Sequence, residues 1–351
     1  MPLPELDQTD AALLSRLQHG LPLVQRPFDP IARELGLGVD QVLIRLRRLK
    51  DQLGVIREIS AIFDSRALGY QSCLVAAGYQ PDQLESAAGV INEHPGVSHN
   101  YQRDAELNLW FTLAVPPSTR LGLQPTIDLL ASTSGARRAL YLPALRVYKI
   151  GVRLDLTESH DPTARSDRTA GTSAAPVGVG TSSFSPDDIP VVRALQNDLP
   201  IQAEPFETAA RQVGVGVDEL LSAASRLLGG GTMRRFAAVL RHDRAGFDAN
   251  VLAAWQVPQD RTDPIGPALG AFSSVSHCYL RPTYPDWPYN VLTMIHGQSR
   301  QECLDIIQAM ARSTGLDAPA QLWSVKQYKK QRLRYFTGEV EKWEAAHVAG
   351  D

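Results

Sequence analysis

One long segment of this chain occurs twice. Residues 17–42 read LQHGLPLVQRPFDPIARELGLGVDQV, and residues 195–220 read LQNDLPIQAEPFETAARQVGVGVDEL. Pro27 in the first segment matches Pro205 in the second, at the offset of 178 residues that separates the two segments. A constant offset between long matching segments indicates a tandem duplication.

The duplication continues beyond this segment. GVSHNYQR at residues 96–103 matches SVSHCYLR at residues 274–281, again 178 residues apart. Between the copies, residues 157–188 are rich in Ser, Thr, Gly, Ala and Pro and hold few large apolar side chains. Such a segment buries too little surface to offset the entropy lost on ordering, so we expect a flexible linker there.

Apolar spacing predicts the same order of elements in each copy. In the first copy, the spacing predicts helices at 7–18, 29–35 and 39–53 and a strand at 55–63. Strand and helix patterns then alternate at 72–78, 83–94, 97–103, 107–115, 121–132 and 140–150. The first set describes a winged helix-turn-helix and the second a ferredoxin-like βαββαβ domain. The predicted fold class is therefore α+β, a tandem duplication of these two domains.

The domain boundaries follow from this order. We expect winged helix-turn-helix domains at 1–64 and 189–242, ferredoxin-like domains at 65–156 and 243–351, and the linker at 157–188. Ferredoxin-like sheets of this type commonly pair, so we expect the two halves to form an internal pseudo-dimer. A homodimer or an assembly with homologous subunits is a further expectation.

Composition narrows the class of protein. The chain has 351 residues, 44% hydrophobic and 21% charged, which is typical of a globular protein with more than one domain. A net charge of −3 gives no overall reason for nucleic-acid binding. The three cysteines have no metal-binding spacing, and no apolar run is long enough to span a bilayer. We expect a cytoplasmic protein with reduced thiols.

The two-domain layout resembles that of the Lrp/AsnC regulators, so the third helix of each copy tests for DNA binding. In the first copy this helix carries Arg45, Arg47, Arg48 and Lys50, which could contact phosphates. The matching segment SAASR at 222–226 keeps one arginine. A dimeric DNA reader needs two equivalent recognition helices. The pattern disfavours DNA binding, and a ligand-responsive regulator remains the alternative.

A polar triple is kept on the second strand of both ferredoxin-like domains. Its members are His99, Tyr101 and Arg103 in the first copy and His277, Tyr279 and Arg281 in the second. Alternation along a strand places the three side chains on one face of the sheet. The residues between them changed from Asn and Gln to Cys and Leu. Because the three residues were retained while their neighbours changed, we expect them to have a functional role.

The residues around the triple suit a large, flat, anionic ligand. Aromatic faces can pack on a macrocycle, and cationic side chains can bind its carboxylates. The further candidates are Trp110, Trp287, Asn290, His296, Lys149 and Lys329. The two lysines end the final strands of their domains, and solvated strand ends are the alternative interpretation of them.

The whole chain resembles the sirohaem decarboxylases of haem d1 and alternative haem biosynthesis, which are Lrp/AsnC-like in fold. The resemblance is carried by LPLVQRPFDPIARELG, GVSHNYQRDAELNLWFTLAV, SVSHCYLRP and PYNVLTMIHG. The first half looks like one subunit type and the second like its partner, here fused. The resemblance implies a carboxy-lyase that converts sirohaem to 12,18-didecarboxysirohaem by removing two acetate carboxyls as CO2.

That reaction assigns roles to the candidates. Loss of CO2 leaves negative charge on the methylene carbon, and a histidine with a pKa near 6.5 is suited to protonating it. We expect His99 and His277 to donate this proton, to partner a substrate carboxylate, or to approach the substrate iron. Tyr101 and Tyr279 would orient a carboxylate or relay a proton. The side chains expected to hold the other carboxylates are Arg103, Arg281, Lys149 and Lys329. No cofactor and no protein-bound metal are expected, because the iron belongs to the substrate.

The two copies differ in ways that predict unequal pockets. The second copy has Leu292 or Val291 in place of Trp110, and the first copy lacks a match to His296. We expect the second half to hold the catalytic pocket, with the first half in support. A haem-binding sensor or carrier is the remaining alternative, in which His296 and the histidines of the triples would be axial iron ligands.

Overall fold

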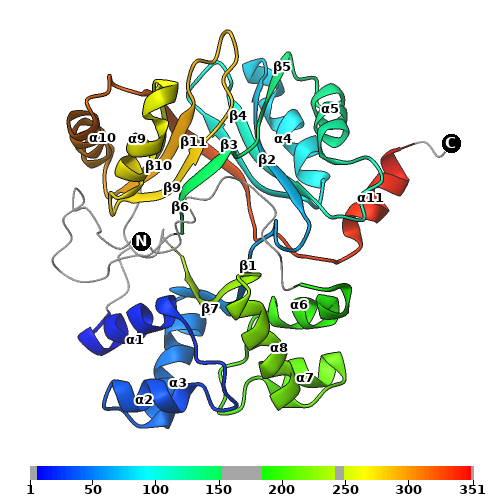
Figure 1. Ribbon diagram of the computed structural model, residues 1–351, viewed down its shortest axis with the longest axis vertical. Coiled ribbons are helices and arrows are strands. Elements are labelled where there is room, and N and C mark those ends of the chain that lie inside the picture. Colours follow the sequence, from blue (N-terminus) through cyan, green and yellow to red (C-terminus); the bar gives the residue numbers. More distant parts are fainter. Residues whose placement is uncertain (1–5, 152–183, 242–248, 349–351) are drawn as a thin grey trace.

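The structure, a computed structural model, describes residues 6–151, 184–241 and 249–348. Figure 1 shows a lower layer of helices and an upper layer in which sheets are flanked by helices. Both layers contain elements from the N-terminal half, in blue to green, and from the C-terminal half, in green to red. The two copies therefore lie side by side, each contributing to both layers.

The lower layer holds the two helical units. The first consists of α1 (Gln8–His19), α2 (Phe28–Glu34), α3 (Val39–Arg47), the π-helical turn η1 (Arg48–Gln52) and β1 (Ile56–Phe63). The second consists of η3 (Pro186–Asp188), α6 (Ile189–Leu195), α7 (Glu207–Val213), α8 (Val217–Gly229) and β7 (Met233–Leu240). Apolar side chains of both units, such as Leu13, Phe28, Leu195 and Phe206, pack in one core. Strands β1 and β7 pair antiparallel, which joins the two wings in one small sheet.

The upper layer holds the two ferredoxin-like units. The first consists of β2 (Gln71–Gly78), η2 (Pro81–Gln83), α4 (Leu84–Glu93), β3 (Val97–Arg103), β4 (Leu109–Val115), α5 (Leu123–Thr133), β5 (Arg138–Leu142) and β6 (Arg146–Ile150). The second consists of β8 (Ala249–Trp255), η5 (Gln259–Arg261), α9 (Thr262–Gly270), β9 (Val275–Leu280), β10 (Val291–Gly297), α10 (Arg300–Thr314) and β11 (Ala320–Lys330), and α11 (Glu339–His347) follows it. The predicted α+β fold, a duplicated helical unit plus βαββαβ unit, is confirmed.

The two upper units exchange the ends of their final strands. The strands of both units form one continuous nine-stranded sheet in the order β5-β2-β4-β3-β11-β8-β10-β9-β6. The half of it that is built on each unit is here called the sheet of that unit. Residues 320–323 of β11 pair with β8 of the same half, whereas residues 324–330 pair with β3 of the other half. In the first half, β5 pairs with its own β2, and β6 crosses to β9. The single strand expected at 140–150 is therefore two strands. Pro143 lies at the break, where a residue without an amide hydrogen cannot continue the ladder.

The two faces of each sheet have different neighbours. Helices α4 and α5 cover the outer face of one sheet, and α9 and α10 cover that of the other (Figure 1). A cluster that includes Trp110, Leu140, Leu252, Trp287 and Leu322 joins side chains of both units on the opposite faces. The two sheets thus pack partly against each other, and the polar triples lie on these inward faces.

Most of the expected linker at 157–188, namely residues 157–183, lies outside the described residues. Its last residues enter the second helical unit, where Phe184 stacks on Phe336 and Asp188 is buried. Among the described residues, no helix is long and apolar enough to cross a membrane.

Candidate functional site

The two polar triples occupy equivalent places in their sheets. On β3, His99 lies opposite Thr112 of β4 and stacks on Tyr101, with ring centroids 6.3 Å apart. On β9, His277 stacks in the same way on Tyr279, with centroids 6.0 Å apart. The duplication has therefore preserved a paired imidazole and phenol on each inward face.

The arginines of the triples are buried and hold the strand exchange together. Arg103 is 6% exposed and donates to the Leu322 carbonyl of β11 at 2.9 Å. Arg281 is 8% exposed and donates to the Leu142 carbonyl of β5 at 2.5 Å. Each therefore binds the final strand of the other half next to the residue where that strand crosses over.

These arginines have no carboxylate partner among the described residues, and the Nε atom of each is buried without a hydrogen bond. Burial lowers the pKa of Arg103 to about 10 and also lowers that of Arg281. A buried cation without an anion is costly. The two buried guanidinium groups lie beside the histidine and tyrosine rings, and they would favour binding of a negatively charged ligand there.

A serine connects to the histidine in each half. Ser98 Oγ lies 3.0 Å from His99 Nδ1 and 2.7 Å from the Thr112 hydroxyl. Ser276 Oγ lies 2.9 Å from His277 Nδ1, but its other partner is Nε2 of His296, at 2.8 Å. The network in the second half thus includes a second titratable ring, whereas the network in the first half links the histidine to a hydroxyl.

Arginines of the lower layer add positive charge to both triples. Burial, together with the charges of Lys330 and Arg57, lowers the pKa of His99 to about 4. Burial raises the pKa of Tyr279, whereas the nearby charges of Arg281, Arg234 and Arg66 act to lower it. Arg57 comes from β1 and Arg234 from β7, so the paired wings bring cations to the sheets above them.

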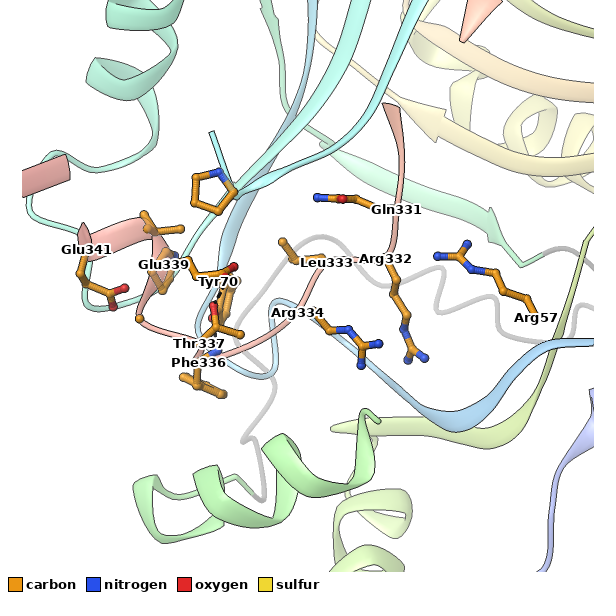
Figure 2. Close-up of a pocket in the computed structure, with 14 residues that line it drawn as sticks. Arg57, Tyr70, Gln331, Arg332, Leu333, Arg334, Phe336, Thr337, Glu339 and Glu341 are labelled. Carbon is orange, nitrogen blue, oxygen red and sulfur yellow. Dashed lines mark hydrogen bonds between the residues drawn. The ribbon is translucent and has the colours of Figure 1, made fainter. Parts of the chain in front are cut away.

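A cavity of about 270 Å³ opens between the first wing and the segment that follows β11. Figure 2 shows Arg57, Arg332 and Arg334 at one end and Glu339 and Glu341 at the other. Arg332 donates to Glu58 at 3.0 Å, and Arg334 lies 3.7 Å from the same carboxylate. The guanidinium group of Arg57 makes no hydrogen bond or ion pair with any of the described residues. The cavity is small for a macrocycle, because ligand pockets usually measure about 300–1,000 Å³, but it is large enough for one acidic side arm.

A larger groove of about 960 Å³ lies at the far end of β9. Arg281 and Asn290 line it, together with Tyr289, Arg146 and Arg261. His277 and Tyr279 do not line this groove. The structure therefore separates Asn290 from the histidine with which sequence analysis grouped it.

Four of the predicted ligand-binding side chains already have partners within the protein. Lys149 Nζ donates to the Phe272 carbonyl at 2.7 Å, and Lys329 Nζ donates to the Asn92 carbonyl at 2.6 Å. Burial lowers the pKa of Lys149 to about 8 and also lowers that of Lys329. The Asn290 amide exchanges two hydrogen bonds with the backbone of Val257, at 2.8 and 2.9 Å. His296 is bound to Ser276 as described above.

The two predicted tryptophans lie in the cluster between the sheets. Trp110 is 2% exposed, donates to the Leu107 carbonyl at 2.6 Å, and packs on Trp287 with centroids 5.5 Å apart. Trp287 is 7% exposed, and its indole nitrogen is buried without a partner. Both rings therefore help to join the sheets.

The cations of the third helix also have partners. Arg45 and Arg48 each lie 2.7 Å from the buried carboxylate of Asp10. Arg47 donates to the Ile201 carbonyl, and Lys50 lies 2.6 Å from Asp198. The arginine kept in the second copy, Arg226, makes the equivalent ion pair with buried Asp188. These contacts give a structural reason for the charges that does not involve DNA.

The serines and the arginines near the wings were not predicted from the sequence. A signal for the serines was available, because SH precedes the tyrosine in both GVSHNYQR and SVSHCYLR. Arg57, Arg66 and Arg234 had no such signal, because their approach to the triples depends on how the wings lie beneath the sheets.

Comparison with known proteins identifies the family. Residues 67–149 and 244–329 match the AsnC-like ligand binding domain, and residues 10–57 and 188–234 match the "Siroheme decarboxylase NirDL-like HTH domain". The chain is 36% identical over 334 residues to the "Siroheme decarboxylase" of Hydrogenobacter thermophilus, which covers 94% of this chain and 96% of that protein. It is 39% identical over 155 residues to the "Siroheme decarboxylase beta subunit" of Desulfovibrio desulfuricans, covering 44% of this chain and 98% of that subunit.

Solved structures agree with this assignment. The crystal structure of the siroheme decarboxylase NirDL aligns with a TM-score of 0.75 at 30% identity, covering 98% of this chain and 99% of that one. A NirDL structure in complex with an iron-uroporphyrin III analogue aligns with a TM-score of 0.74 at 31% identity, covering 97% and 99%. The duplicated fold, the paired triples and these similarities over nearly the whole length show that the chain belongs to the sirohaem decarboxylase family of enzymes.

Proposed function

We propose that this chain decarboxylates sirohaem to 12,18-didecarboxysirohaem. In each step the bond between an acetate methylene and its carboxylate breaks, CO2 leaves, and the electron pair stays on the methylene carbon. A proton then completes a methyl group, so no electrons are gained or lost and the reaction needs no redox cofactor. The support is family membership together with the paired triples.

The observation that carries the proposal is the repeated arrangement of a stacked histidine and tyrosine next to a buried, anion-free arginine. Sirohaem carries eight carboxylates, and the cations around the triples oppose that charge. Arg57 would hold one acidic side arm beside His99, and Arg66 would do so beside Tyr279, whereas Arg234 is already paired with Asp64 at 2.6 Å. Holding the side chains that do not react fixes which acetate meets a proton donor.

The proposed roles of the triple residues follow from their chemistry. A histidine can donate a proton near neutral pH, and the stacked tyrosine can orient the reacting carboxylate. Arg103 and Arg281 would act mainly by electrostatic attraction, because each already binds a backbone carbonyl. Lys149, Lys329 and Asn290 would act by positioning the strands and loops rather than by contact with the substrate.

The proposal includes an internal pseudo-dimer. Three pairings join the halves, namely β1 with β7, β3 with β11, and β6 with β9. Each triple therefore borrows an adjacent strand from the other half. A single half would lack that strand, so we expect both halves to be required for activity.

Anaerobic incubation of the purified chain with sirohaem, followed by mass spectrometry of the extracted tetrapyrrole, tests the proposal. We expect a product lighter by two CO2 and its loss in the double variant His99→Ala/His277→Ala. The matched control is His19→Ala, which removes an exposed histidine of α1 that lies far from the triples in sequence. Unchanged sirohaem that copurifies with the wild-type protein would contradict catalysis and favour the sensor or carrier. Salt-dependent DNA binding without sirohaem binding would favour the regulator.

A further inference from the structure

The two histidine networks end on different residues, although they start from the same strand position. His296 and Ala114 occupy equivalent places, because the amide of His296 donates to the Ser274 carbonyl and that of Ala114 donates to the Gly96 carbonyl, both at 3.0 Å. Ala114 is buried and has no polar side chain. The first half therefore has no titratable group where the second half has an imidazole.

The Ser276 hydroxyl is placed to connect two rings. It is 4% exposed and lies 2.9 Å from Nδ1 of His277 and 2.8 Å from Nε2 of His296. A hydroxyl has one hydrogen and two lone pairs, so it can accept from one ring while it donates to the other. Its alternative acceptor, the Met294 carbonyl, lies farther away at 3.3 Å.

We propose that His296 and Ser276 form a proton relay to His277, which makes the second half the proton-donating half of the enzyme. This inference rests on the proposed decarboxylation. The imidazolium of His296 gives its Nε2 proton to Ser276, and the Ser276 proton passes to Nδ1 of His277. The Nε2 proton of His277 then forms the new C–H bond as the C–C bond to CO2 breaks. One proton is consumed for each CO2 released. To reset the site for the second acetate, His277 returns its Nδ1 proton through Ser276 to His296 and takes up a proton at Nε2 from the solvent.

The first half has no equivalent proton relay to its histidine. Ser98 links His99 to the Thr112 hydroxyl, which does not titrate near neutral pH. The depressed pKa of His99, about 4, also keeps that ring neutral under physiological conditions. His99 is therefore suited to accept or orient, and His277 to donate. In this assignment Ser276 and His296 are positioning residues that act through His277.

The test compares Ser276→Ala with Ser98→Ala in the full-length chain. We expect Ser276→Ala to lower kcat by about 10- to 100-fold with little change in KM, because the donor itself contributes about 10²- to 10⁴-fold. Ser98→Ala should lower kcat by less than about 3-fold on the same scale. Ser276→Thr keeps the hydroxyl and should restore most of the lost rate. Imidazole in solution should partly rescue His296→Ala, because it can replace the missing proton source.

Several outcomes would overturn the relay. Equal losses in Ser276→Ala and Ser98→Ala would show that the halves do not differ in proton supply. Ser276→Thr could lose activity and melt at a lower temperature to a matching degree. That result would mean that Ser276 acts only in packing and not in proton transfer. If both the wild-type chain and the His296→Ala variant are fully active, the relay is wrong, but the proposed decarboxylation is still supported. If the wild-type chain releases no CO2 from sirohaem, both the relay and the proposed decarboxylation are wrong.

Discussion

The β3 and β9 triples contain the same three residues at the same strand positions, yet their surroundings differ. His99 lies in a network that ends on Thr112, whereas the network of His277 continues to His296. Cations from different wing strands approach each triple. Duplication thus retained the three residues of the triple, while the residues behind them changed. We therefore expect the two triples to serve different steps, because the hydrogen bonds that support their histidines differ.

Replacement of the two histidines one at a time should give the largest difference. We expect His277→Ala to lower kcat by about 10²- to 10⁴-fold, as loss of a general acid does, and His99→Ala to lower it by about 10-fold or less. The rate of product formation, followed by mass spectrometry, measures both. A reversed order would assign the donor to the first half. Accumulation of a singly decarboxylated product in one variant would assign one acetate to each histidine.

A second comparison involves His94 and its counterpart Phe272, which precede the two triples by the same distance in sequence. His94 is fully buried, and its pKa is lowered from 6.5 to about 4, mainly by burial and also by the charge of Lys329. Between these values the unfolded chain binds a proton that the folded chain does not. Stability conferred by the neutral ring is therefore present above pH 6.5 and is lost as the pH falls toward 4.

The expected loss at His94 is about 3 kcal/mol in the free energy of unfolding, since each pKa unit corresponds to about 1.4 kcal/mol. Urea unfolding between pH 7.5 and 4.5 measures it. The variant His94→Phe, which copies the second half, should flatten the pH dependence; part of the slope remains because the pKa of His99 is also depressed. An unchanged slope in His94→Phe would mean that other groups cause the acid sensitivity.

The smallest effect is expected in the lower layer. Asp188 and Asp10 are both buried, but Asp188 has the ion pair with Arg226, whereas Asp10 is shared by Arg45 and Arg48. Arg226→Ala should lower the free energy of unfolding by about 1–2 kcal/mol, because it leaves a buried carboxylate without that partner and the arginine itself is half exposed.

Arg48→Ala should lower the free energy of unfolding by less than about 1 kcal/mol, because Arg45 remains. Chemical denaturation of both variants at pH 7 and moderate salt checks the order. Equal losses in the two variants would mean that Arg45 does not compensate. A larger loss in Arg48→Ala would show that the first helical unit depends on that ion pair more than the second depends on its own.

The sequence predicted most helices and strands, because apolar periodicity reports which face of each element is buried. Strand β3 begins and ends where alternation placed it, at residues 97–103. The faces were also predicted correctly, since Asn100 is fully buried and bonds to Asn92 of α4, while His99 and Tyr101 point away from that helix. The contacts of the candidate residues were less predictable. Arg103 and Lys329 bind backbone carbonyls, and a sequence does not show which carbonyl a cation will meet.

Three properties of the protein follow from its amino-acid sequence alone, namely the duplication, the α+β elements of each copy and the common face of the two triples. These properties depend on spacing within a single segment, and local side-chain alternation is sufficient to set them. Three other properties depend on tertiary contacts: β6 and β11 cross between the halves, Ser276 joins His277 to His296, and wing arginines approach the triples. Such features depend on which distant segments pack together, because strand partners and hydrogen-bond acceptors are chosen by contacts that form across the whole chain.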